Sequence, residues 1–160
     1  MEQANMGHIP MEMKRPDYEL YHYKTAFEPV ELHFHDFYEV FILLSSAAVY
    51  QIDGHQYTLT PGSILLISPQ ELHRPLSASP AGELYERVDI YIRPEYIAMR
   101  SNHRNNLLAC FQRSISCYGG NLLQAGEHTR QRIMDVIDNL RNQVNDKEFG
   151  YQLLEEAYLT

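Results

Sequence analysis

Three histidines and one glutamate offer the clearest chemistry in this sequence. His33 and His35 are separated by one residue, so on an extended strand both imidazoles point to the same face. Glu39 follows four residues after His35 and keeps that parity if the strand continues, and His73 comes later, just after Pro69. Two imidazoles and a carboxylate that converge from rigid strands form a good donor set for a divalent metal. The sequence therefore predicts a site made of His33, His35, Glu39 and His73 that suits Zn, Ni, Mn or Fe.

The elements that must position these residues are short strands separated by turns. Runs rich in Val, Ile, Leu, Tyr or Phe alternate with turn residues, a pattern typical of an antiparallel sandwich or barrel. The predicted strands are Tyr18–Tyr23, Glu31–Phe34, Phe37–Leu44, Ala47–Ile52, His55–Leu59, Ser63–Ile67 and Leu84–Ile92.

A hairpin at Asp53-Gly54 sets the register of two of these strands. A two-residue loop of this composition favours a type I′ turn, which fixes the pairing of the flanking strands. The expected pairs are Ile52 with His55, Tyr50 with Tyr57, and Ala48 with Leu59. This set is the more apolar face, so we expect it to point inward. Tyr50, His55 and Tyr57 then become candidates for lining an effector pocket, although tyrosines also fill barrels without any ligand.

The last predicted strand leaves two orientations open. Tyr85, Arg87, Asp89 and Tyr91 share one face. If that face points inward, Arg87 becomes an anchor for an anionic effector. If it points outward, this is an ordinary amphipathic strand, which is the orientation that we favour.

The chain changes character after Pro94 and becomes helical. Asn105–Phe111 suits a short helix, Glu127 to about Val144 has apolar residues at helical spacing, and another helical run begins near Phe149. The apolar stripe either packs onto the barrel or forms a dimer contact. The candidate dimer residues are Ile133, Ile137, Leu140, Val144, Leu153, Leu154 and Tyr158.

The spacing of the first four residues resembles the two motifs of the cupin superfamily. They are His33-x-His35-x3-Glu39 and Gly62-x6-Pro69-x3-His73, although Ser46 stands where the first motif usually has Gly. The resemblance implies a mainly β fold, a double-stranded β-helix (a cupin or jelly-roll barrel), here followed by C-terminal α-helices.

Longer stretches, including His35–Val40, Tyr57–Pro69, Glu71–Pro75 and Tyr85–Arg87, resemble the N-terminal domain of AraC-type transcription regulators. This resemblance covers roughly residues 18 to 160. It implies a barrel that senses a small molecule such as a sugar or small organic acid, helices that form a homodimer, and DNA binding only through a C-terminal domain absent from this chain. We therefore expect a mobile arm (1–17), a barrel (18–96) and a helical part with the dimerisation helices (97–160).

Composition excludes several other classes of protein. A formal charge of −8 and a pI near 5.4 argue against direct nucleic-acid binding, which needs a concentrated basic face. No stretch approaches the roughly 20 apolar residues that span a bilayer, and residues 1–14 do not resemble a signal peptide. We expect a cytoplasmic protein with no membrane partner.

Two alternatives to the sensor stay open. One is a metal-dependent cupin enzyme, such as a dioxygenase or isomerase, that uses the histidine and glutamate cluster. The other is a dimerisation scaffold whose barrel binds nothing. The cluster itself could also be a hydrogen-bonded polar group without metal. We favour a non-enzymatic sensor, because catalysis also needs an open coordination position and a placed acid or base.

Overall fold

The computed structural model describes residues 11–79, 84–116 and 120–145. Its contacts divide the chain into two compact units, Met1–Leu123 and Gln124–Thr160. The first unit therefore extends well beyond residue 96, and the expected division into arm, barrel and helical part stays a prediction. Within the described residues, no helix is long and apolar enough to cross a membrane.

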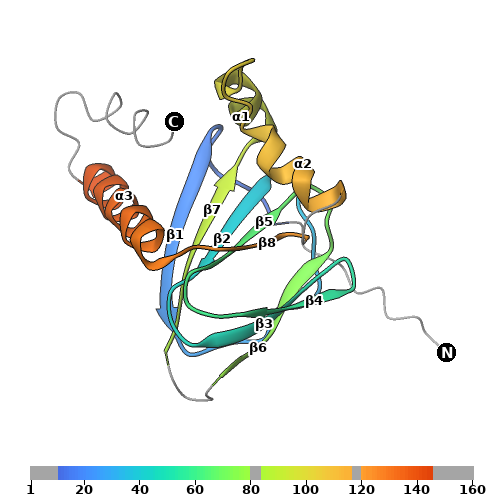
Figure 1. Ribbon diagram of the computed structural model, residues 1–160, viewed down its shortest axis with the longest axis vertical. Helices are drawn as coiled ribbons and strands as arrows, with labels where there is room; N and C mark the ends of the chain where they lie inside the picture. Colours follow the sequence, from blue (N-terminus) through green and yellow to red (C-terminus); the bar gives the residue numbers. More distant parts are fainter. Residues whose placement is uncertain (1–10, 80–83, 117–119, 146–160) are drawn as a thin grey trace. The chain divides into compact units, whose positions relative to one another are not determined.

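Two β-sheets form the first unit and face one another (Figure 1). The larger sheet has the order β1 (Tyr18–Thr25), β7 (Tyr85–Ile92), β2 (Tyr38–Leu43), β5 (Ser63–Ile67) and β8 (Leu122–Gln124). The smaller sheet has the order β4 (His55–Leu59), β3 (Ala47–Ile52) and β6 (His73–Ser79). This mainly β arrangement is the jelly-roll fold that the sequence predicts.

The predicted hairpin is confirmed in detail. Asp53 and Gly54 both have positive φ angles, 45° and 82°, as a type I′ turn requires. β3 and β4 pair Ile52 with His55, Tyr50 with Tyr57, and Ala48 with Leu59. The bounds of β3, β4 and β5 are those expected from the sequence.

The expected strand Glu31–Phe34 is wrong, because only His33 forms a β-bridge there. His33 and His73 exchange one pair of backbone hydrogen bonds, 3.1 and 2.9 Å long, and the chain bends at Asp36 before β2 begins. Its partner strand β6 was not predicted, because Pro75 interrupts the pattern. β6 tolerates that proline because it lies at the edge of its sheet, opposite a register shift in β3.

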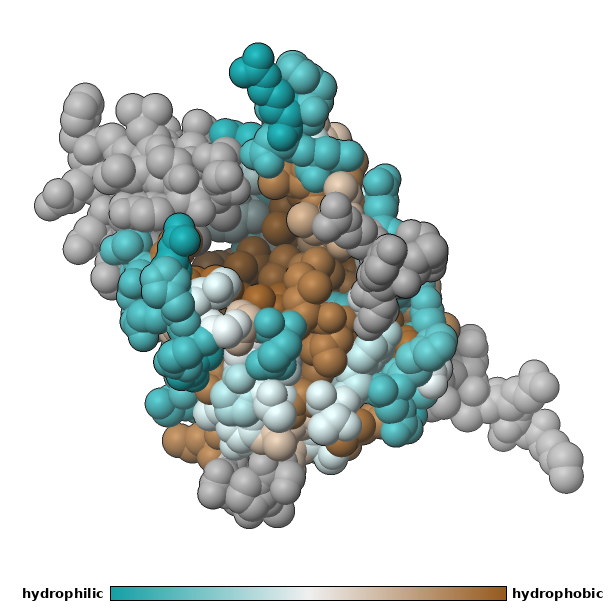
Figure 2. Space-filling model, in the orientation of Figure 1, coloured by the Kyte–Doolittle hydropathy of each residue, from teal (hydrophilic) through white to brown (hydrophobic). Residues whose placement is uncertain are grey.

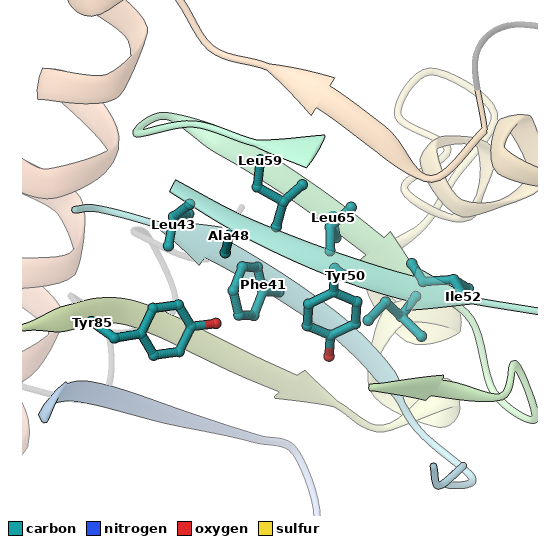
Figure 3. Packing of buried hydrophobic residues seen from close by; sticks show 9 residues of the cluster. Phe41, Leu43, Ala48, Tyr50, Ile52, Leu59, Leu65 and Tyr85 are labelled. Carbon is teal, nitrogen blue, oxygen red and sulfur yellow. The ribbon is translucent and has the colours of Figure 1, made fainter. Parts of the chain in front are cut away.

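The core lies between the two sheets. Phe41 from β2 and Tyr50 from β3 meet there with ring centroids 5.1 Å apart (Figure 3). The buried residues of this cluster are Phe41, Leu43, Ala48, Tyr50, Ile52, Leu59, Leu65, Ile67 and Tyr85. The face of the hairpin placed inward from the sequence supplies Ala48, Tyr50, Ile52 and Leu59.

Two helices follow β7 and cover the outside of the larger sheet. α1 (Pro94–Arg100) starts with proline at its first position, where a missing N–H costs nothing, yet it was not predicted. α2 (Leu108–Ser116) overlaps the expected helix 105–111 but begins and ends later. Ile97 and Phe111 pack with Leu66 of β5. Figure 2 shows hydrophobic surface in the middle of the face that this view presents, with hydrophilic residues around it.

The second unit contains α3 (Glu127–Asn145), the amphipathic helix expected from the sequence. Of the candidate dimer residues, Ile133 is half-buried and Ile137 is buried. The side chains of Leu140 and Val144, and the whole of Leu153, Leu154 and Tyr158, lie outside the described residues. The dimer assignment stays a prediction.

Gly120, just before β8, provides a test of the packing. Its φ is +75°, and a Cβ added there would overlap the Tyr57 hydroxyl. We expect Gly120→Ala to lower the free energy of unfolding by about 2–3 kcal/mol, from strain and overpacking together. Gly54→Ala has the same backbone strain but open space, and should cost about 1 kcal/mol. Gly126→Ala, with no atom within 4 Å of the added Cβ, is the neutral control in denaturant unfolding. Equal losses at positions 120 and 54 would contradict the overlap.

Candidate functional site

Three of the four predicted ligand residues converge in the interior. The potential ligand atoms of His35, Glu39 and His73 all lie within 4.8 Å of one another, and all three residues are buried. His35 Nε2 lies 2.9 Å from Glu39 Oε2, and His73 Nε2 lies 3.4 Å from the same oxygen. β2 carries Glu39 and β6 begins at His73, while His35 precedes β2. This His–Glu–His group could hold a metal ion.

Backbone carbonyls fix the ring orientation of the histidines. The Nδ1 atoms of His33, His35 and His73 lie 2.8–2.9 Å from carbonyl oxygens of Glu31, Phe37 and Glu71. A carbonyl only accepts, so each Nδ1 carries the proton and donates it, which leaves Nε2 with its lone pair in the neutral ring. Metal-binding histidines are commonly held by such a bond from the other ring nitrogen.

This arrangement makes the cluster a candidate cation site. With Nδ1 protonated, neutral His35 and His73 point Nε2 lone pairs at a carboxylate oxygen that is itself an acceptor. Three acceptors in a buried space require protons or a metal ion between them. The residues therefore fit a divalent metal, which would be held by His35, Glu39 and His73.

The electrostatics of the cluster favour an ionised Glu39 beside a protonated His73. Burial would raise the pKa of Glu39, but hydrogen bonds from His35 and His73, and their charges, lower it to about 2. Burial would lower the pKa of His73, but the hydrogen bond and charge of Glu39 raise it above its usual value. Glu39 is thus ionised, and it favours the protonated form of His73.

His33 lies beside this group without completing it. Its ring centroid is 4.3 Å from that of His73 and 6.4 Å from that of His35, but His33 is not among the three residues with converging ligand atoms. It is half-buried, and burial, followed by the charge of His73, lowers its pKa. The four-ligand site predicted from the sequence is therefore a converging group of three with a fourth histidine next to it.

A cavity of about 60 Å³ opens beside the cluster. His33 and Glu39 line one part of it, and Arg87, Asp89 and Tyr91 of β7 line another. The remaining lining residues are Met11, Val30, Phe41, Tyr50 and Pro75. Ionic and aromatic groups thus meet in one small, partly enclosed space.

The inward orientation of β7 corrects the one that we favoured from the sequence. Arg87, Asp89 and Tyr91 point to the cavity, so this is not an amphipathic surface strand. Arg87 Nε donates to Asp89 Oδ2 at 3.0 Å, and its guanidinium lies over the ring of Tyr23, 4.4 Å from the centroid. The sequence pattern misled because a face with two charges is usually exposed, whereas here the charges pair with each other.

Asp89 is the functional candidate that the sequence did not single out. It is buried, and its Oδ1 has no hydrogen-bond partner in the described part of the chain. Burial raises the pKa of Asp89 to about 7, and the charge of Glu39 adds to this effect against the opposing effect of Arg87. Its place two residues from Arg87, on the same strand face, is the only signal that could have suggested it.

Of the three effector candidates on the hairpin, only Tyr50 lines the cavity. His55 is exposed at the turn, so its expected inward orientation is wrong. Tyr57 is half-buried, and its hydroxyl donates to Asn121 Oδ1 at 3.2 Å. His55 is exposed because it adjoins the turn, and the Tyr57 hydroxyl is held away from the cavity by Asn121, which lies just before β8.

The segment before β1 lies at the cavity and against the barrel. Met11 lines the cavity, and Met13 is buried with Phe37 and Tyr91. Arg93 Nη2 donates to the carbonyl of Met13 at 2.9 Å. Residues 11–13 are therefore part of the packed unit.

A family model for the AraC-like ligand binding domain matches residues 17–160. The chain belongs to this family. Membership makes this AraC-like domain a ligand-binding module and implies a small-molecule effector. A comparison with curated proteins gives no match.

Solved structures similar to this AraC-like domain include several cupins. One is a cupin protein from Bacteroides fragilis (22% identity, 48% of this chain and 64% of that one, TM-score 0.39). Another is a cupin-2 domain protein from Shewanella frigidimarina (24% identity, 51% and 76%, TM-score 0.40). A third is a cupin-like protein from Thermotoga maritima (20% identity, 50% and 60%, TM-score 0.43).

Proposed function

We propose that this chain is the effector-sensing and dimerisation domain of an AraC-type transcription regulator, and that its effector binds in the cavity beside His33 and Arg87. The observation that carries the proposal is a small cavity with ionic groups on two sides, in a chain of a ligand-binding family. A buried polar cavity is costly for a protein that merely needs a scaffold, because each unpaired polar group reduces stability.

The sensing mechanism is a shift between conformations. An effector that contacts β7 and the segment around Met11 together stabilises the state in which both are in place. The C-terminal helices, through which we propose that two copies associate, would pass this difference to DNA-binding domains elsewhere in the regulator. The cytoplasm is the expected location of such a regulator.

A thermal-shift screen tests the proposal. The panel comprises sugars, polyols, small organic acids and small amines, each with and without added divalent metal. A ligand that binds only the folded state raises the melting temperature, by an amount set by its concentration relative to Kd. We expect at least one chemical class to raise the melting temperature in a concentration-dependent way. No shift across the panel would favour a scaffold without a ligand.

The converging His–Glu–His group favours one further candidate, a metal-dependent cupin enzyme such as a dioxygenase or isomerase. A bound metal would supply Lewis acidity there, with His35, Glu39 and His73 as its ligands. This candidate predicts stoichiometric metal in protein purified without added metal, and loss of that metal in His35→Ala. Elemental analysis without metal above background would exclude it.

A further inference from the structure

The ion pair on β7 changes what Arg87 offers to a ligand. Arg87 Nε is bonded to Asp89, and the guanidinium lies between the rings of Tyr23 and Tyr85, at 4.4 and 5.2 Å from their centroids. The cation is therefore compensated before any ligand enters. It is a weaker anchor for an anion than its residue type suggests.

The group left without a partner in this part of the cavity is an acceptor. Asp89 is 3% exposed, and its Oδ1 has no hydrogen-bond partner among the described residues, although Asp89 lines the cavity. Buried acceptors in native proteins nearly always have partners, so an orphan beside a cavity indicates that the partner comes from outside. Above its pKa of about 7 the Asp89 carboxylate is ionised and accepts only, so in that state its partner must be a donor.

The charges around the cavity support the same conclusion. Two carboxylates, Glu39 and Asp89, line it with a single guanidinium. An anion without a donor would be repelled by both carboxylates. It would also leave Asp89 Oδ1 unpaired, and each of these effects weakens the binding of the anion. A hydroxyl or amine can instead donate to that oxygen.

We infer that Asp89 is the specificity-determining residue of the cavity, and that it selects small effectors carrying a hydroxyl or amine donor over acids that lack one. The inference rests on the proposed function, since it concerns the ligand of the same cavity. The volume of about 60 Å³ limits the enclosed part of that ligand. At about 10–15 Å³ for each water-sized position, the space holds about four to six non-hydrogen atoms.

Matched fragment pairs test the inference by ligand-detected NMR on the full chain at about pH 8, where Asp89 is ionised. The probes are small diols, amines and hydroxy acids, each with a donor-free partner (the O-methyl ether of a hydroxyl, the quaternary trimethylammonium form of an amine), together with simple carboxylates that have no donor. We expect the parent compounds to bind and full methylation to weaken binding about tenfold or more, the loss of one hydrogen bond to a charged group. Equal binding of parent and methylated partner, or preference for donor-free acids, would overturn the inference while leaving the proposed function intact. No binding by any class would overturn both.

Two substitutions of Asp89 separate recognition from folding. Asp89→Leu removes the acceptor, and we expect it to lower the affinity for donor fragments by about 10–100-fold. Asp89→Asn keeps the shape of the side chain, but its single oxygen must face the Arg87 Nε donor, which puts the amide NH2 where Oδ1 lies. We therefore expect Asp89→Asn also to weaken the binding of donor fragments, by about tenfold or more, even if the leucine variant folds poorly. The control is Glu86→Gln on the same strand, whose carboxylate pairs with His22 and Lys24 rather than lining the cavity. Unchanged binding in both Asp89 variants would overturn the inference.

Discussion

Glu39→Ala should lower the free energy of unfolding by about 3 kcal/mol or more, measured by denaturant unfolding in the presence of a chelator. Glu39 is buried between His35 and His73, and its Oε2 lies 2.9 and 3.4 Å from their Nε2 atoms. Removing one partner of a buried charged group leaves the others without compensation, and such losses are commonly 3–5 kcal/mol.

A matched control separates this effect from the general cost of removing a glutamate. Glu86 also pairs with a histidine and a lysine, but its side chain is more exposed, at 19%. Glu86→Ala should therefore cost about 1 kcal/mol or less. Equal losses in the two variants would show that the His–Glu–His group does not stabilise the fold.

The stability of the protein should be greatest on the acid side of neutrality. Glu39 has its pKa lowered to about 2, so its contribution is complete above about pH 4.5 and is lost as the pH falls toward 2. Asp89 has its pKa raised to about 7, so the folded state holds a proton that the unfolded state releases near pH 4, and stability falls as the pH rises from 4 to 7. The raised pKa of His73 adds a loss above its usual value of 6.5.

The measurement is a series of denaturant unfolding curves from pH 4 to pH 8 with a chelator present. We expect a maximum between about pH 4 and 6, and a decrease of about 1–2 kcal/mol from pH 5 to pH 7, within the limit of about 1.4 kcal/mol per pH unit for one group. Asp89→Asn removes the titrating carboxyl and should flatten this decrease. A wild-type curve that rises from pH 5 to pH 7, or an unchanged slope in Asp89→Asn, would contradict the environment described for Asp89.

The sequence was most informative where a local pattern determines the geometry. The Asp53-Gly54 turn has one favoured conformation, so the pairing of Tyr50 with Tyr57 followed from it and is confirmed. His35 and Glu39 meet as the sequence predicts, but the chain bends at Asp36 between them, so strand parity alone does not account for their approach. His73 joined the site through the motif resemblance, because its approach depends on how the two sheets meet.

The sequence was least informative where tertiary contacts override local pattern. β6 was not predicted because Pro75 interrupts its pattern, and nothing in the local sequence indicates that this strand lies at a sheet edge. The face of β7 was misassigned because the pairing of Arg87 with Asp89, which makes burial of both tolerable, depends on side-chain geometry. Asn121, which bonds to Tyr57, Leu66 and Glu71, lies just before β8, a short strand whose partner β5 is distant in sequence.

The central claim is that an effector binds inside the barrel, and a calorimetric titration of two tryptophan variants tests it most directly. Val30 lines the cavity and is 40% exposed, whereas its neighbour Leu32 is 42% exposed and is not among the lining residues. With the strongest compound from the thermal-shift screen, we expect Val30→Trp to weaken binding at least about tenfold by filling the cavity, a change of about 1.4 kcal/mol. We expect Leu32→Trp to bind like the wild type. Equal affinity in all three proteins would place the ligand outside this cavity and contradict binding inside the barrel.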